Sequence, residues 1–194
     1  MDQQTRRAVG LTLLLWAACV GVVLWLWIDD PREELRHPAV LFSAWLAVGY
    51  WAAAGRELIR YGRIAQWFVA TTGWSVARMN WALSAVTLWL HLGIAMHAAH
   101  GWSLDRALAH VATADGSGIG FWFSLGVAAV WAADAAWLAA HADSYLGRPR
   151  WVGWAVHGLI AFFVFNAAVV FVGWPGRAVG LAVFGWLGWA WWRR

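Results

Sequence analysis

Long apolar segments alternate with short polar stretches along the whole of this 194-residue chain. A helix needs about 20 residues to cross a hydrocarbon core roughly 30 Å thick, so the pattern predicts an all-α, polytopic transmembrane bundle of about six spans. The predicted spans are residues 8–28, 38–54, 81–99, 120–141, 151–172 and 178–192. The second and sixth are short, which leaves bundles of four or five spans as alternatives.

The composition excludes a soluble globular protein. Hydrophobic residues make up 62% of the chain and charged residues 12%, and the mean hydropathy is +0.57, which leaves too little polar surface for a soluble fold. We expect two parts: residues 1–79, with two spans and a cytoplasmic interfacial connection, and residues 80–194, a histidine-containing bundle. The single cysteine, Cys19, excludes an intrachain disulfide.

The arginines predict the orientation in the membrane, because basic residues in short loops resist translocation. One set of predicted loops and tails holds ten arginines: Arg6, Arg7, Arg56, Arg60, Arg63, Arg78, Arg148, Arg150, Arg193 and Arg194. The opposite loops hold four: Arg32, Arg36, Arg106 and Arg177. This bias places both termini in the cytoplasm of a bacterial inner membrane and the 100–120 loop outside. The positive net charge is then explained by the arginines that set the orientation. The expected partner is the lipid bilayer, and no nucleic-acid partner is expected.

Tryptophan is abundant, with 20 residues, and amphipathic indole rings favour the membrane interface. The tryptophans expected at the outer interface are Trp25, Trp27, Trp102, Trp122 and Trp174. Those expected at the inner interface are Trp81, Trp151, Trp154, Trp189, Trp191 and Trp192. The cytoplasmic connection, residues 55–80, mixes arginines with aromatic residues and predicts either a helix on the headgroups or a solvated connector.

Polar residues inside the apolar segments need partners, because a charged group at the bilayer centre costs about 2.5–3.5 kcal/mol. In the third predicted span they recur at helical spacing, which puts them on one face toward protein or water. These residues are Asn80, Ser84, Thr87 and His91. In the next two spans Asp134 and His157 fall at nearly the same depth, which predicts a hydrogen-bonded pair. Asn166 is expected at the level of His97.

Four histidines crowd the end of the third predicted span: His91, His97, His100 and His110. His97 and His100 are three residues apart and share a helix face, and Ser103 predicts the N-cap of a short surface helix that carries His110. Several imidazoles with a carboxylate or amide are typical ligands of copper, zinc, iron or haem. Ordinary hydrogen-bonded or solvated histidines, proton transfer and quinone contact are the alternatives.

A haem would need imidazoles from two helices. Here the chain disfavours a diheme cytochrome b, because Gly101 and a polar break separate His97 from His110. A single haem b bound by His97 or His100 together with His37 remains an alternative to a metal ion. No nucleophile motif, phosphate-binding loop or CxxCH segment is present, so no catalytic residue is assigned, and an enzymatic role stays open.

Three segments resemble a group of uncharacterised bacterial multi-pass membrane proteins that share an H-x5-H-x2-H-x-W-S motif. They are WLHLGIAMHAAHGWS at 89–103, AVWAADAAWL at 129–138 and RPRWVGWAVHGLIAFFVFNAAVVF at 148–171. The resemblance covers residues 80–175 and implies roles for His91, His97, His100, Trp102, Ser103, His110, Asp134, Trp151 and Asn166. Leu104 stands where the group often has a further histidine. The resemblance implies a functional half of the chain and names no reaction.

Together these patterns predict a transition-metal ion, copper favoured over iron or zinc, or a single haem at a histidine-lined outer-leaflet site. The expected setting is electron transfer or membrane oxidoreductase chemistry. The candidate ligands are His91, His97, His100 and His110, supported by Asp134, His157, Asn166 and Ser103. The alternative is a non-catalytic structural or assembly subunit whose small residues and tryptophans pack against other membrane subunits.

Overall fold

A computed structural model describes residues 3–29, 38–61 and 76–193, which are almost entirely helical and include no strand. The helices are α1 (Gln3–Asp29), α2 (Pro38–Tyr61), α4 (Val76–Ala98), α5 (Leu104–Asp115), α6 (Ile119–Ala140), α7 (Ala142–Leu146), α8 (Arg150–Phe165) and α9 (Gly176–Trp192). The π-helical segment η1 (Asn166–Val170) continues α8. The predicted all-α bundle is confirmed.

Five helical segments are long and apolar enough to cross a membrane. They correspond to the first five predicted spans. The sixth segment forms α9, whose 17 residues stand at the lower end of the range of about 17–25 residues for a spanning helix. Within the described residues, α9 therefore accompanies the five longer helices as a shorter apolar helix. His37 and most of the 55–80 connection, with its expected surface helix, lie outside the described residues.

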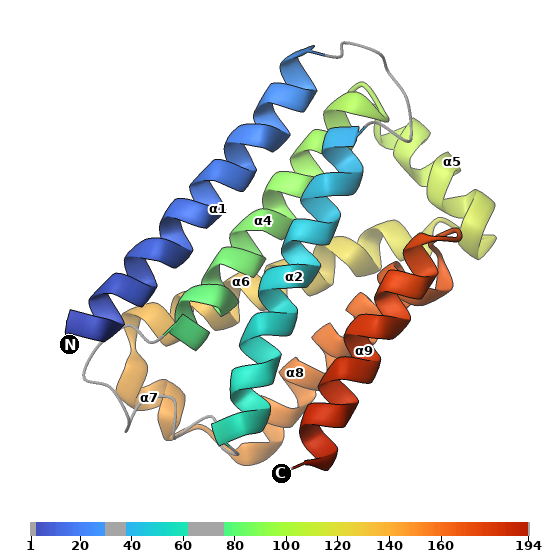
Figure 1. Ribbon diagram of the computed structural model, residues 1–194. Helices are drawn as coiled ribbons and strands as arrows, with labels where there is room; N and C mark the ends of the chain where they lie inside the picture. The colour runs from blue at the N-terminus through green and yellow to red at the C-terminus, as the bar shows by residue number, and fades with distance from the viewer. Residues whose placement is uncertain (1–2, 30–37, 62–75, 194) are drawn as a thin grey trace.

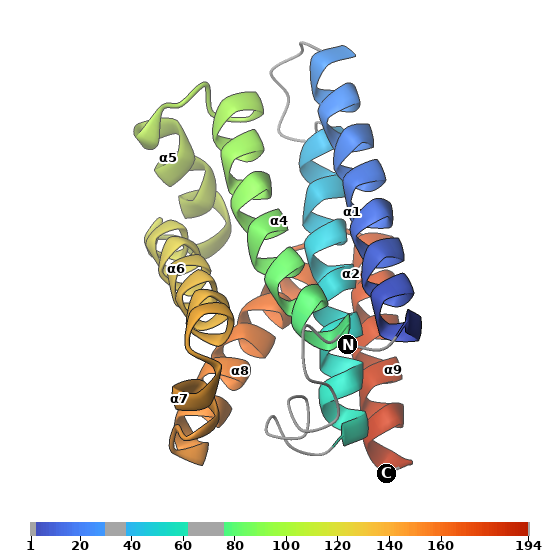
Figure 2. The same ribbon diagram turned by 90° about the vertical axis from the view of Figure 1, so that its left-hand side faces the viewer.

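The helices α1, α2 and α4 lie side by side, and α9 packs on the other side of α2 (Figures 1 and 2). The second view shows α5 and α6 on the side of α4 that faces away from α1. In Figure 1 α1 runs upward and α9 runs downward, so both chain ends point toward one end of the bundle. The helix α5 lies toward the opposite end.

The polar stripe of α4 faces protein, as the helical spacing predicts. Ser84 and Thr87 are fully buried. The Ser84 hydroxyl donates to the Ala47 carbonyl of α2 at 2.6 Å, and the Trp16 indole of α1 donates to Thr87 Oγ1 at 2.9 Å. Because apolar lipid gives little force for helix association, such interhelical hydrogen bonds help to select the packing partner. The stripe thus joins α4 to both N-terminal helices.

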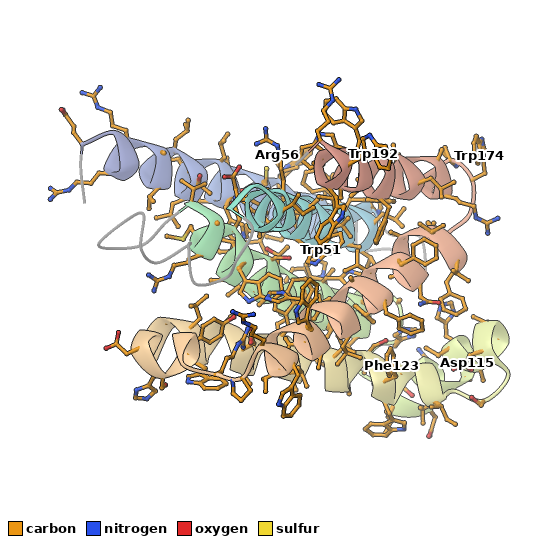
Figure 3. All side chains as sticks on the ribbon, turned by 90° about the horizontal axis from the view of Figure 1, so that it is seen from below. Trp51, Arg56, Asp115, Phe123, Trp174 and Trp192 are labelled. Atoms are coloured by element: carbon orange, nitrogen blue, oxygen red, sulfur yellow. The ribbon has the colours of Figure 1, made fainter. Side chains whose placement is uncertain are left out.

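The largest apolar core lies between α2, α4, α6, α8 and α9. Its biggest fully buried side chains include Trp81 and Trp131, whose ring centroids are 5.2 Å apart. Trp81, which was expected to mark the inner interface, is 2% exposed and is enclosed within the bundle. By contrast, Trp174 and Trp192 lie on the periphery of the bundle, while Trp51 points inward (Figure 3). The core also joins the two expected parts of the chain.

The short helix α9 is held where α8 widens into η1. Arg177 donates from Nε to the Val169 carbonyl at 2.9 Å and from Nη2 to the Val170 carbonyl at 3.2 Å. These carbonyls lie at the end of a helix and lack partners within it. A Cβ at Gly180 would come within 2.1 Å of the Ala168 carbonyl oxygen. Only glycine therefore allows α9 to approach η1 this closely.

The turn from α5 into α6 depends on one carboxylate, that of Asp115, the last residue of α5 (Figure 3). Its Oδ1 accepts hydrogen bonds from the amides of Ser117 and Gly118 at 2.8 and 2.7 Å, and its Oδ2 accepts one from Gly120 at 2.7 Å. The three amides precede or begin α6, where free N–H groups need acceptors and a negative charge is favourable. Asp115 therefore sets the angle between α5 and α6.

The amide hydrogen bonds from Ser117, Gly120 and Gly118 lower the pKa of Asp115 below its ordinary value of 3.8. The stabilisation is full above that ordinary value and is lost as the pH falls through the lowered one. We expect Asp115→Ala to lower the melting temperature in detergent at neutral pH, and Asp115→Asn to lower it less, since one oxygen remains. Equal melting temperatures for both variants and the natural chain would contradict this role.

Candidate functional site

The His97 ring contacts two tryptophans, Trp102 and Trp27. Its Nδ1 accepts a hydrogen bond from the Trp102 indole at 3.0 Å, and its ring meets the Trp27 ring edge-on at 5.2 Å between centroids. An indole N–H can only donate, so Nδ1 of His97 is unprotonated and the neutral ring carries its proton on Nε2. Neither nitrogen of His97 then offers a free lone pair to a metal ion.

His91 lies between α2 and α4. Its Nδ1 is 3.1 Å from the Val40 carbonyl oxygen and 3.2 Å from Ser43 Oγ. A carbonyl only accepts, so Nδ1 of His91 is the protonated nitrogen and Nε2 keeps the lone pair. His91 precedes His100 by nine residues, which is about 13 Å along a helix. The two side chains cannot bind the same ion, and the predicted four-histidine cluster does not form.

His100 and His110 do come together. Their ring centroids are 5.5 Å apart with 44° between the ring planes, although one ring follows α4 and the other belongs to α5. His100 is buried and His110 is exposed. Burial lowers the pKa of His100, and the nearby His110 lowers it further, so His100 is neutral and keeps a lone pair near neutral pH. The ring beside His100 is therefore that of His110, while His97 contacts Trp102 and Trp27.

The separation of the two rings can be compared with metal coordination. An ion bound by an imidazole nitrogen at about 2.0–2.1 Å lies about 3.2 Å from that ring's centroid. Two rings on one ion are then about 5.2 Å apart at a tetrahedral angle and about 5.5 Å apart at a trigonal one. Within residues 3–29, 38–61 and 76–193, no three His, Cys, Asp or Glu side chains form a metal-binding group. The pair alone supplies two ligands.

The backbone at the end of α4 brings the pair into place. Gly101 and Trp102 have φ angles of 54° and 59°, and the Trp102 amide donates to the Met96 carbonyl at 2.8 Å. Positive φ is costly for a residue as large as tryptophan, and here the amide and indole hydrogen bonds of Trp102 offset the cost. Ser103 then accepts from the Arg106 amide at 3.3 Å and caps α5. The predicted cap is confirmed.

A second polar cluster surrounds Asp134 of α6. Its Oδ1 pairs with Arg148 Nη1 at 2.5 Å, and its Oδ2 accepts from the Trp81 indole and the Tyr145 hydroxyl, both at 3.0 Å. Arg148 also donates from Nη2 to the Tyr145 hydroxyl at 2.8 Å. The side chains of Asp134 and Arg148 are 3% and 4% exposed. A buried charge pair needs such full hydrogen bonding to offset its desolvation.

The Asp134 carboxylate also keeps the hydroxyl of Tyr145, in α7, protonated. Burial raises the pKa of the Tyr145 hydroxyl, and the charge of Asp134 raises it further. The hydroxyl is therefore neutral and donates its proton to Asp134. The cluster satisfies its own polar groups and joins α4, α6 and α7 with the loop before α8.

The prediction of a hydrogen-bonded pair between Asp134 and His157 is wrong. The Asp134 oxygens bond to Arg148, Tyr145 and Trp81, while His157 packs its ring on Trp81 at 4.7 Å between centroids. Within the described chain, the buried His157 Nε2 has no hydrogen-bond partner. Asp134 and His157 both contact Trp81, as their similar depth suggests. The Arg148 guanidinium, however, forms the stronger hydrogen bonds with the Asp134 carboxylate.

The remaining predicted residues have local roles. Asn166 begins η1 and donates to the Phe162 carbonyl of its own helix at 2.8 Å. Trp151 is 71% exposed near the start of α8, which fits an interfacial ring. His141 ends α6 and is exposed. None of these three side chains joins the histidine pair or the Asp134 cluster.

Comparisons with family models, with curated proteins and with solved structures find no match to this chain. The resemblance to multi-pass proteins with the histidine motif therefore stays a prediction. The site has to be interpreted from its own geometry.

The sequence reasoning missed Arg148 and Tyr145. Tyr145 lies in α7 and Arg148 in the loop that follows it, a segment whose arginines indicate only orientation when the sequence is considered alone. A usable signal was present, because a buried carboxylate such as Asp134 requires a cation or several donors. Tyr145 and Arg148 follow Asp134 by 11 and 14 residues, in the segment that leads to the next span.

We expect the Asp134 and Arg148 substitutions to be strongly coupled. Arg148→Met leaves a buried carboxylate without its cation and should cost about 3–5 kcal/mol of unfolding free energy. The double variant Asp134→Asn with Arg148→Met should lose about 2 kcal/mol less than the sum of the single losses. Denaturant unfolding in detergent measures all three variants.

His157→Phe is the matched control for this cycle, because it keeps a ring on Trp81 and removes a nitrogen that lacks a partner. Its unfolding free energy should change by less than about 1 kcal/mol. Strict additivity of the Asp134 and Arg148 effects, or a larger loss for His157→Phe than for Arg148→Met, would show that the ion pair does not hold the cluster.

Proposed function

We propose that this membrane protein binds a transition-metal ion between His100 and His110, copper before iron or zinc. The observation that carries the proposal is the 5.5 Å separation of two imidazole rings held by different helices. That separation matches two ligands of one ion at a near-trigonal angle. Imidazole is a good ligand for copper, zinc and iron, and the proposed setting is electron transfer or membrane oxidoreductase chemistry.

A bare ion is favoured over a haem. Two axial imidazoles lie on opposite sides of a haem iron, which would put their centroids about 6.4 Å apart. The observed separation of His100 and His110 is shorter, at 5.5 Å. A haem between them would also need the width of a porphyrin, whereas α5 packs directly on α6 beside this corner.

The proposed location is a bacterial inner membrane with both termini in the cytoplasm and the histidine pair at the outer leaflet. The excess of arginine in the loops on the side of the termini supports this orientation. The opposite directions of α1 and α9, and the position of α5 away from the chain ends, agree with a single side for both termini (Figure 1).

A second candidate function is a non-catalytic subunit of a membrane complex. It is favoured by α1, because only 11% of the residues in its apolar, membrane-length segment are buried inside the bundle. Its exposed side chains include Leu11, Leu14, Leu15 and Ile28. A helix with so few contacts to its own chain presents a long face to lipid or to another subunit.

The metal proposal predicts one bound ion per chain in protein purified without chelators and loaded with copper. His100→Ala and His110→Ala should each lower the affinity by at least about tenfold, because a two-imidazole site loses half of its ligands. His141→Ala is the control, since His141 is exposed at the end of α6, distant in the fold from the pair. Equilibrium dialysis with metal analysis gives the stoichiometry and the affinity.

Equal affinity in the natural chain, His100→Ala, His110→Ala and His141→Ala would remove the histidine pair as the site. Absence of any stoichiometric metal in the natural chain would favour the subunit alternative.

A further inference from the structure

A thioether lies one helical turn before His100. Helical hydrogen bonding continues past the end of α4, with the Ala99 amide donating to Ala95 at 2.9 Å and the Gly101 amide donating to His97 at 3.0 Å. Met96 and His100 are four residues apart within this helical turn. Residues at this spacing lie on the same helix face, with about 5–6 Å between their Cβ atoms. Met96 therefore shares the face that His100 presents to His110.

The backbone of Met96 is fixed at the same corner. Its carbonyl accepts the Trp102 amide at 2.8 Å, and Trp102 is tied to α4 a second time through His97. Its side chain is partly buried, so the thioether is neither enclosed in the core nor free in solvent. A methionine has three rotatable bonds and a polarizable sulfur, which lets it reach a site from a neighbouring turn.

Within the described residues, no third His, Cys, Asp or Glu side chain joins the pair in a metal-binding group. A third ligand from this part of the chain would therefore be of another type, and a thioether is the soft ligand that the last turn of α4 supplies.

We propose that Met96 is the third ligand and that the ion is Cu(I), held in a trigonal arrangement by Met96, His100 and His110. This inference rests on the proposed function, and it assigns both a ligand and an oxidation state to the site. Thioether sulfur is a soft ligand that selects Cu(I), whereas Zn(II) takes four ligands and gains little from a thioether. The ring separation of 5.5 Å agrees with a trigonal angle.

The test is a competition titration of the full chain in detergent against a chromogenic Cu(I) chelator, under ascorbate and without oxygen. Met96→Leu keeps the size of the side chain and removes the sulfur. It should lower the Cu(I) affinity by about tenfold or more and change the Zn(II) affinity by less than about threefold. Met79→Leu is the matched control, because Met79 is a second thioether on α4 far from the pair.

X-ray absorption at the copper edge supplies an independent readout. The Cu(I)-loaded natural chain and Met79→Leu should show one sulfur neighbour beside two imidazoles, and Met96→Leu should show none. Unchanged Cu(I) affinity and an all-nitrogen spectrum in the natural chain would overturn the role of Met96. Tighter binding of Zn(II) than of Cu(I) would overturn the oxidation state and leave the histidine site standing. Failure of both ions to bind would overturn the proposed function itself.

Discussion

The buried pair of Asp134 and Arg148 is the constraint on which the arrangement of the second half of the chain depends. A carboxylate that is 3% exposed inside an apolar bundle is stable only with a cation and hydrogen-bond donors around it. Arg148 and Tyr145 arrive from the segment after α6, and Trp81 arrives from α4. The needs of one charged group therefore determine where three separate segments meet.

This cluster bears on the histidine corner through two helices. Trp81 stands near the start of α4 and Asp134 near the end of α6, and farther along, the Trp89 indole donates to the Ala128 carbonyl at 3.2 Å. At the other end, Asp115 orients α5 on the start of α6. Hydrogen bonds thus join α4 and α6 at two points along their length. At the end of α4, His100 meets His110 of α5.

The apolar pattern was enough to predict the helical class and the first five spans, because a chain in lipid must satisfy its backbone hydrogen bonds within a helix. It also predicted the buried face of α4, because side chains three and four residues apart lie on one side of a helix. Ser103 also predicted its cap, since that signal is local. The partners of Asp134 were not predictable from spacing, because Arg148 reaches it only when α7 folds back. The choice between His97 and His100 depends on the positive φ angles at Gly101 and Trp102, which send the chain into α5.

Polar groups inside the bundle bind one another across the helices, and we propose that the pair of His100 and His110 at the α4–α5 corner binds an ion. His91 and His157 are engaged with helix packing, and His97 is engaged with Trp102. The most direct measurement is a crystal structure of the copper-loaded full chain with anomalous data at the copper edge. The account predicts one anomalous peak between the His100 and His110 rings. A peak beside His91, His97 or His157 instead would contradict it.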